Sequence, residues 1–373
     1  MFKIFWDNED IKAVSKVIRR GMHWTCGPES SEFEKMLADY VGTKYAAVFS
    51  SGTTALHAAI LAHKIKEGDE VIVPSFTFIA TANTVLHAGA KPIFADIETK
   101  TLGLDPNDVK EKITAKTKAI IPVHYGGSPC LIRELKEISE DHNLLLIEDA
   151  AESIGARVEK KKVGTFGDSA MLSFCQNKVI TTGDGGAVVT DSMEAYERLK
   201  LLRSHGRPEN SDYFTTREPM DYITLGYNYR MSEITAALGL SQLSKIEKII
   251  KMRRERAEYM NKKLSKVKNL LPPKPVLAHY FHVYQMYTIK VLKGRKIRDD
   301  LASFLAEKGI MTKIYFSPVH LTHFYKKELR YKSKLPVTEE MSKQVLTLPL
   351  HPLLTTREMD YITDEVKSFF SGR

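Results

Sequence analysis

Cysteine is scarce in this chain, with three among 373 residues: Cys26, Cys130 and Cys175. None of them forms a CxxC pair, so the sequence contains neither a disulfide framework nor the ligand spacing of a zinc site. We therefore expect reduced, mostly buried thiols and no bound metal.

Long apolar runs are also absent. No run reaches the roughly 18 residues that a membrane-spanning helix requires. The first ten residues, MFKIFWDNED, carry charged side chains in place of the continuous apolar segment of a secretory signal. These two absences predict a cytoplasmic protein with no transmembrane helix and no membrane partner.

Basic residues are in surplus, but no basic arm concentrates them. Lys and Arg number 55 against 46 Asp and Glu, which gives a net charge of +9. The local clusters at 160–162 and 248–256 form no patch interleaved with aromatic residues, so we expect no nucleic-acid partner. A phosphorylated or nucleotide-linked substrate fits the surplus as well.

What the chain does contain, from about residue 44, is a regular alternation of short apolar runs and helical stretches. This alternation is typical of a parallel sheet covered by helices. The predicted strands are 44–51, 69–75, 91–97, 119–124, 144–149, 169–174 and 185–191, and the helices between the early ones are 54–63, 80–88, 106–113 and 132–142.

The pattern changes after Asp191. Helices dominate to about residue 268, interrupted by a loop at Pro208–Pro219, and then strands are predicted at 282–292 and 309–315, before a closing helix from Thr356. We predict an α/β fold: a large three-layer αβα domain with a mostly parallel sheet (1–245) and a smaller α+β C-terminal domain (246–373). The boundary falls within a long helix predicted between residues 232 and 263. A single larger domain with a helical tail is the alternative.

Ligands of such sheets bind beyond the carboxyl ends of the strands, and polar residues follow several of the predicted strands. Lys178 lies between the run 169–174 and a Gly-rich turn, where a partly desolvated amine suits Schiff-base chemistry. Taken alone, it is more typical of a solvated surface lysine. Asp149 ends the run 144–149, where a carboxylate could keep a pyridine nitrogen protonated or could cap a following helix.

Two further features complete the pattern. Gly52 and Thr53 begin a helix whose N–H groups and dipole favour a phosphate, and the Ser173 hydroxyl could assist; a plain helix cap gives the same pattern. Phe78 could stack on a flat ring or belong to the core. Because phosphate cup, aromatic, acid and lysine follow strands of one sheet in order, they together describe a single cofactor, pyridoxal 5'-phosphate (PLP).

These segments also resemble a known family, the PLP-dependent sugar aminotransferases of the DegT/DnrJ/StrS group within the fold type I aminotransferases. The resemblance runs from WTCGPESSEFE through SSGTTAL, EDAAESIGA, SFCQNKVITTGDGG and GYNYRMSE to LPLHPLLT, nearly the whole chain. It implies that Lys178 forms the Schiff base and moves protons. It also implies that Asp149 pairs with the pyridine nitrogen, that Phe78 stacks on the ring, and that Gly52, Thr53 and Ser173 hold the phosphate.

The same resemblance implies roles that no local pattern shows. Asn228 would reach the phosphate of the neighbouring subunit, which makes the active unit a homodimer with shared sites. Glu152, where many members have Gln, would lie near the phenolic oxygen of PLP. His320, His205 and Tyr315 would lie near the substrate, although a structural or surface position is equally typical of either histidine.

The segment Cys175-Gln176-Asn177 before Lys178 stands where many members have His-Pro-Thr, and with Glu152 it is similar to the branch that includes perosamine synthases. This implies transfer of an amino group from L-glutamate to a nucleotide-linked keto-sugar, for example GDP-4-keto-6-deoxymannose, in polysaccharide or O-antigen biosynthesis. Lys178 itself argues against the dehydratase branch, which has histidine there. A keto-cyclitol aminotransferase and a PLP-fold regulator without turnover are the alternatives.

Overall fold

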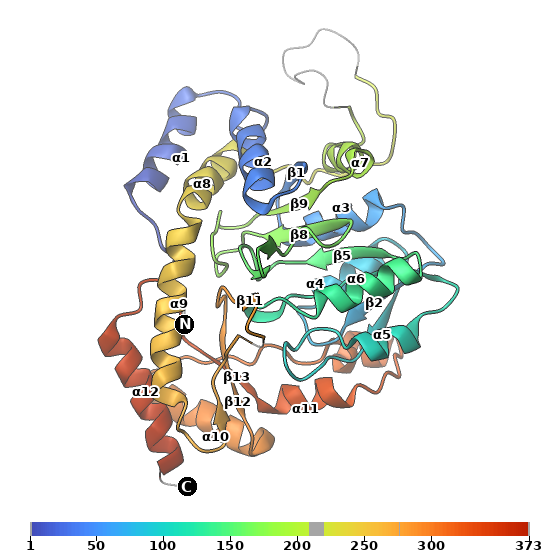
Figure 1. Ribbon diagram of the computed structural model, residues 1–373. Coiled ribbons are helices and arrows are strands. Elements are labelled where there is room, and N and C mark those ends of the chain that lie inside the picture. Colours follow the sequence, from blue (N-terminus) through green and yellow to red (C-terminus); the bar gives the residue numbers. More distant parts are fainter. Residues whose placement is uncertain (1, 209–219, 276, 372–373) are drawn as a thin grey trace.

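The computed structural model describes residues 2–208, 220–275 and 277–371 (Figure 1). The predicted loop at Pro208–Pro219 lies outside these ranges except for Pro208. The helices are α1 (Asn8–Arg20), α2 (Pro28–Val41), α3 (Gly52–Ala62), α4 (Ala80–His87), α5 (Pro106–Lys112), α6 (Ile132–Asp141), α7 (Met193–Arg203), α8 (Glu233–Ser244), α9 (Ile246–Leu264), α10 (Gly294–Glu307), α11 (Pro336–Gln344) and α12 (Thr356–Ser371), with short turns η1 (Tyr125–Gly127), η2 (Val319–Leu321) and η3 (Phe324–Glu328). The strands are β1 (Tyr45–Phe49), β2 (Glu70–Pro74), β3 (Lys91–Ala95), β4 (Thr117–Ile120), β5 (Leu145–Asp149), β6 (Arg157–Val158), β7 (Lys161–Lys162), β8 (Ser169–Ser173), β9 (Gly186–Thr190), β10 (Leu270–Leu271), β11 (Tyr280–Phe281), β12 (Tyr287–Val291) and β13 (Val345–Leu348).

A seven-stranded sheet in the order β1-β9-β8-β5-β4-β2-β3 forms the centre of the fold. β9 is antiparallel to both of its neighbours, and all other neighbouring pairs are parallel. All seven predicted strands are present, although β4 spans 117–120 rather than 119–124. Pro122 lacks the N–H group that a ladder needs, and pairing resumes only as an isolated bridge between Val123 and Asp149.

Helices cover both faces of the sheet. Successive residues of a strand point to opposite faces, so each strand contributes to an apolar core on either side. Val71 and Val73 of β2 belong to a core with α3 and α4, whereas Ile72 packs in a second core with Leu135 of α6. Figure 1 shows α5 and α6 on one side of the sheet and α4 on the other. The predicted three-layer α/β architecture is therefore confirmed.

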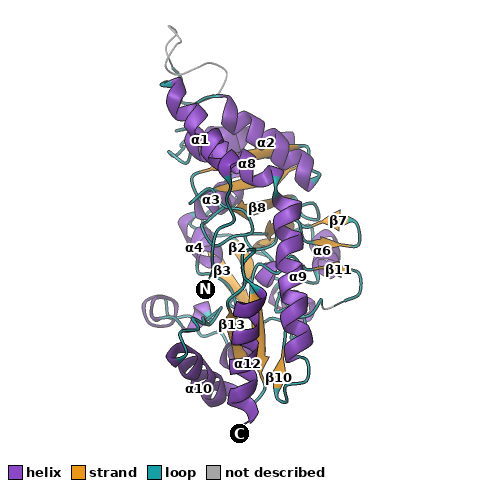
Figure 2. Cartoon of the chain, turned by 90° about the vertical axis from the view of Figure 1, so that its left-hand side faces the viewer, coloured by secondary structure: helices purple, strands orange, loops and turns teal. Residues whose placement is uncertain are grey.

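The C-terminal part contains a separate antiparallel sheet, β10-β12-β13, with its own apolar core. Figure 2 places β13, α10 and α12 together at the end of the molecule opposite α1 and α2. The predicted closing helix is confirmed as α12. The predicted single helix between 232 and 263 is two helices that break at Lys245, whose amine pairs with Asp7 and Asp10. The predicted domain boundary near 245 coincides with this break, and the division into two domains stays a prediction.

The predicted strand 309–315 is wrong. Within it only Lys313 pairs, in an isolated bridge with Thr347. The predicted strand 282–292 is shortened to β12, which lies between two unpredicted strands, β10 and β13. Ile314 and Tyr315 instead pack against the buried cluster around Phe76. The apolar residues that suggested a strand therefore serve side-chain packing between the two parts of the chain.

The strand directions determine where the polar residues meet. β1, β2, β4, β5 and β8 all run the same way, so their carboxyl ends lie at one edge of the sheet. Within the described ranges, no helix combines the length and the apolar character needed to cross a membrane.

Candidate active site

Lys178 lies in the connection between β8 and β9, with 14 % of its side chain exposed. The connection is fixed by backbone bonds: the Lys178 N–H donates to the Cys175 carbonyl at 2.9 Å, and the Thr182 N–H donates to the Phe174 carbonyl at 3.0 Å. These bonds fix the backbone on both sides of Lys178. Its environment is the partly desolvated one expected for a nucleophilic amine.

Glu152 is the acidic partner of this lysine. Its Oε1 lies 3.6 Å from the Lys178 Nζ, and its Oε2 accepts the Gly126 N–H at 2.8 Å. Because the second oxygen is anchored on the backbone after β4, the carboxylate is held facing the amine. The pair therefore places a fixed carboxylate beside the Lys178 amine.

Asp149 lies at the end of β5 with 5 % of its surface exposed. The Thr81 hydroxyl donates to Oδ2 at 2.8 Å, and the Ala151 N–H donates to Oδ1 at 3.2 Å. Burial raises the pKa of the carboxyl group, while these two bonds and the Lys178 charge act in the opposite direction. The helix that Asp149 could have capped is absent, since 151–155 forms turns. A buried acid held by neutral donors is suited to a cationic ring nitrogen.

The turn from β1 into α3 forms a compact cradle. The Ser51 hydroxyl caps the helix by accepting the Thr54 N–H at 3.1 Å, and the N–H groups of Gly52 and Thr53 stand in the same first turn. A Cβ on Gly52 would lie 3.0 Å from the Ser173 Oγ, so this glycine brings the turn against the end of β8. A helix N-terminus with an adjacent hydroxyl is a favourable site for a phosphate dianion.

The remaining predicted residues have varied environments. Phe78 follows β2 and is 61 % exposed. Asn228 is exposed, in a segment whose Tyr229 carbonyl accepts the Ser50 N–H at 2.7 Å, so the segment lies beside the end of β1. Tyr315 lines a small cavity together with Asn177, the neighbour of Lys178.

The two histidines differ from each other. His205 is exposed, with a left-handed backbone (φ 62°), and its N–H donates to the Tyr227 carbonyl. His320 is 2 % exposed, and its Nδ1 lies 2.7 Å from the Ser75 Oγ. A substrate contact by either histidine stays a prediction, and His320 has the contacts of a residue that joins η2 to the end of β2.

Three residues of this site were not predicted from the sequence. Thr81 bonds Asp149, Gly126 bonds Glu152, and the Gln285 amide donates to the Asn177 carbonyl beside Lys178. Thr81 lies three residues after Phe78 in the sequence. This closeness to a predicted cofactor residue is the signal that could have found it. Gln285 comes from the C-terminal part of the chain, and no local pattern marks it.

The groups at this edge of the sheet are of the kinds that PLP requires: a helix N-terminus for the phosphate, a buried carboxylate for the pyridinium and an enclosed amine for the carbonyl. Within the described ranges, no group of three or more His, Cys, Asp or Glu side chains is placed to hold a metal ion. Fold and site together define a PLP-dependent aminotransferase of fold type I.

The chain belongs to the DegT/DnrJ/EryC1/StrS aminotransferase family, whose profile matches residues 5–367. It is 39 % identical over 332 residues to the GDP-perosamine synthase of Caulobacter vibrioides (89 % of this chain, 87 % of the relative). It is 37 % identical over 342 residues to that of Escherichia coli O157:H7 (92 % and 90 %).

Solved structures agree with this assignment. Helicobacter pylori PseC, an aminotransferase involved in the biosynthesis of pseudoaminic acid, aligns with a TM-score of 0.93 at 30 % identity, covering 100 % of this chain and 98 % of that one. The putative sugar aminotransferase Spr1654 of Streptococcus pneumoniae in its PMP-form aligns with a TM-score of 0.92 at 25 % identity, covering 99 % and 98 %. The chain is thus similar throughout its length to sugar aminotransferases.

Proposed function

We propose that this aminotransferase moves an amino group from L-glutamate to a nucleotide-linked keto-sugar, of the 4-keto-6-deoxyhexose type such as GDP-4-keto-6-deoxymannose. The observation that carries the reaction class is the enclosed Lys178 amine, 3.6 Å from Glu152, at the strand ends that also present Asp149 and the α3 N-terminus. The sugar class is supported by the identity to two GDP-perosamine synthases.

We assign the cofactor-holding roles as follows. Gly52, Thr53 and Ser173 would hold the phosphate, with Asn228 contributed by a second copy of the chain. Asp149 would pair with the pyridine nitrogen, and the exposed ring of Phe78 would cover the cofactor ring. When bound, PLP supplies the electron sink that makes a Cα proton of the amino donor labile.

Lys178 would then transfer the proton. Its Nζ would take a proton in one half of the reaction and return it in the other. The Glu152 carboxylate, 3.6 Å away, would orient the amine, and the Gly126 N–H keeps that carboxylate in place. Gln285 holds the backbone of Asn177 and so positions the lysine from the C-terminal side.

The substrate and assembly assignments rest on surface features. A net charge of +9 favours a polyanionic substrate. Tyr315, His205 and His320 are assigned to the substrate side. Large apolar side chains are exposed along α1 and the segments on either side of it, which supports a homodimer; they are Trp6, Ile11, Ile18, Met22 and Trp24. We place the protein in the cytoplasm.

The test is mass analysis of products from PLP-loaded protein with L-glutamate and a panel of GDP-, dTDP- and UDP-linked 4-keto sugars, alongside a keto-cyclitol. The proposal predicts an amino sugar from at least one nucleotide-linked member and none from the cyclitol. Amination of the cyclitol alone would contradict the sugar assignment. A visible absorbance band that L-glutamate never shifts would indicate a regulator without turnover.

A further inference from the structure

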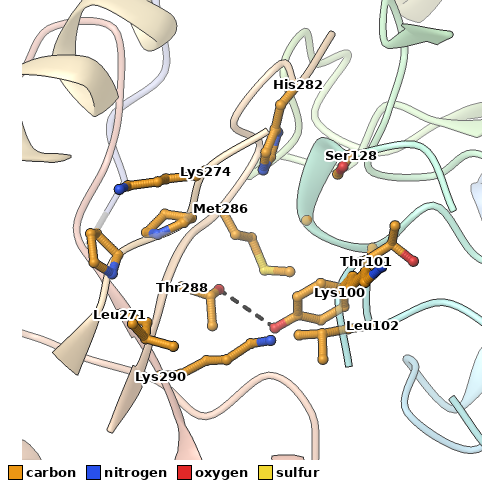
Figure 3. A pocket seen from close by; sticks show the side chains of 14 residues that line it. Lys100, Thr101, Leu102, Ser128, Leu271, Lys274, His282, Met286, Thr288 and Lys290 are labelled. Atoms are coloured by element: carbon orange, nitrogen blue, oxygen red, sulfur yellow. Dashed lines mark hydrogen bonds between the residues drawn. The ribbon is translucent and has the colours of Figure 1, made fainter. Parts of the chain in front are cut away.

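A cavity of about 170 Å³ lies where the C-terminal part meets the edge of the sheet, and none of the residues assigned to PLP lines it (Figure 3). Its wall combines the loop after β3, η1, the loop after β10 and β12. The polar residues that matter are Lys100, Tyr125, Ser128, Lys274, His282 and Lys290. The cavity is therefore built from both parts of the chain.

The charge of this cavity has one sign. Its lining includes three lysines, Lys100, Lys274 and Lys290, and no carboxylate. Among the described residues, no Asp or Glu forms an ion pair with any of these three. They come from three different segments, so the fold, and not a charged run in the sequence, brings them to one cavity.

Lys290 is the most enclosed of the three. It projects from β12, and its amine donates to the Thr99 carbonyl. Burial lowers its pKa, with the Glu98 charge acting in the opposite direction. The half-buried Lys290 ammonium feels the Glu98 charge but forms no ion pair with a described Asp or Glu, so an anion in the cavity would offset the cost of its burial.

The neutral donors of the wall are largely engaged elsewhere. The Tyr125 hydroxyl donates to the Tyr315 carbonyl, and the Thr101 hydroxyl donates to Glu98. The lysine ammonium groups are thus the main donors left for a ligand, since each has three N–H groups and Lys290 uses one of them on Thr99. Leu102, Leu271 and Met286 supply apolar walls. Lysines act on phosphates as point charges, whereas bidentate carboxylate recognition is typical of arginine.

We propose that this cavity is a binding site for a compact phosphate-bearing anion, separate from the catalytic site. Its volume is below the roughly 300–1,000 Å³ of pockets that enclose drug-sized ligands, so a whole nucleotide sugar is too large for it. The occupant connects the sheet, through Lys100, to the C-terminal part, through Lys274 and Lys290. Gly126 lies between the two sites, since it lines the cavity and donates its N–H to Glu152.

The test is calorimetric titration of PLP-loaded protein with inorganic pyrophosphate, since bound PLP fills the cofactor's own phosphate site. Lys274→Gln and Lys290→Gln should each weaken binding by about tenfold or more, because each removes one of three cations around the anion. Lys274 is exposed, so its variant keeps the fold even if the Lys290 variant does not. Lys293→Gln, an exposed lysine three residues from Lys290 and outside the cavity, is the matched control and should bind as the parent does.

Three results would overturn the proposal. They are no binding at millimolar pyrophosphate, binding that persists unchanged in both variants, and binding of citrate as tight as that of pyrophosphate. Product formation from L-glutamate and keto-sugars is measured separately, so failure of this site and failure of the proposed function are distinguishable.

Discussion

At the scale of a single residue, the burial of Asp149 that suits the proposed cofactor site lowers the stability of the folded protein. Its carboxyl group is buried, its partners are neutral donors, and burial raises its pKa above the ordinary value of 3.8. An acid whose pKa is raised on folding holds its proton more tightly in the folded state. Its contribution to stability therefore falls as the pH rises from 3.8 through the raised value.

We predict that Asp149→Asn stabilises the cofactor-free protein at pH 7 by roughly 1–2 °C in melting temperature, because it removes a charge that the fold holds at a cost. The same variant should lose PLP affinity and activity, since it no longer pairs with a cationic ring. Melting curves with and without PLP between pH 4 and pH 8 check both halves. A melting temperature of the cofactor-free variant below that of the parent at pH 7 would refute the first half.

Thr81 offers a second test at this scale. Thr81→Val keeps the shape but removes the donor to Asp149, and a hydrogen bond to a charged group contributes about 1.5–3 kcal/mol, so we expect PLP to bind roughly tenfold to a hundredfold more weakly. Thr84→Val is the control, because among the described residues the Thr84 hydroxyl bonds only the Ala80 and Thr81 carbonyls of its own helix. Equilibrium dialysis measures the PLP affinity of both variants. Equal losses of affinity in the two would contradict a specific role for the Thr81 hydroxyl.

The sequence predicts residues whose signal is local and misses those whose partner is distant. Lys178 and Asp149 each follow an apolar run, so the sheet rule places them at the ligand edge. Thr81 bonds a carboxylate 68 positions away, and Gln285 bonds a carbonyl 108 positions away. Such contacts depend on packing that no local pattern encodes.

At the scale of elements, the cradle depends on close approach between β9 and the β1–α3 turn. A Cβ on Gly186 would lie 2.5 Å from the Ser51 carbonyl oxygen and 2.6 Å from the Gly52 nitrogen. Both neighbours are backbone atoms, so no side-chain rotation relieves the clash. This contact sets the position of the α3 N-terminus relative to the sheet.

Gly186→Ala should therefore push β9 away from the turn, cost about 1–3 kcal/mol of stability and weaken PLP binding. Ala187→Gly, one position along the same strand, is the control for altered strand propensity, because it adds no atoms to the turn. Chemical denaturation and PLP titration report on the two effects. Unchanged PLP binding in Gly186→Ala would contradict the dependence of the phosphate cradle on this contact.

The elements themselves were predictable to different degrees. The seven strands of the large sheet follow from apolar runs bounded by turn residues, because a parallel sheet covered on both faces requires such runs. The segment 309–315 has the same composition but packs its side chains between the two parts of the chain, and β13 was missed. Apolar periodicity alone does not distinguish a strand from a packed connection.

At the scale of the whole molecule, the C-terminal part contributes directly to the site around Lys178. Gln285 bonds the backbone before the lysine, and the buried Arg253 of α9 donates to the Tyr284 and Gln285 carbonyls. Tyr315 and Asn177 line one cavity from the two parts. Lys178 is therefore positioned by the junction between the parts as well as by the sheet.

The central claim is that Lys178 moves the proton in amino transfer. The most direct measurement is the half-reaction of PLP-loaded protein with L-glutamate, followed as 2-oxoglutarate formed per subunit in the parent and in Lys178→Ala. The parent should form about one equivalent, whereas Lys178→Ala should be slower by a factor of roughly 100 or more, because it lacks the general acid–base group. Equal rates of 2-oxoglutarate formation in a folded, PLP-binding Lys178→Ala variant would contradict the account.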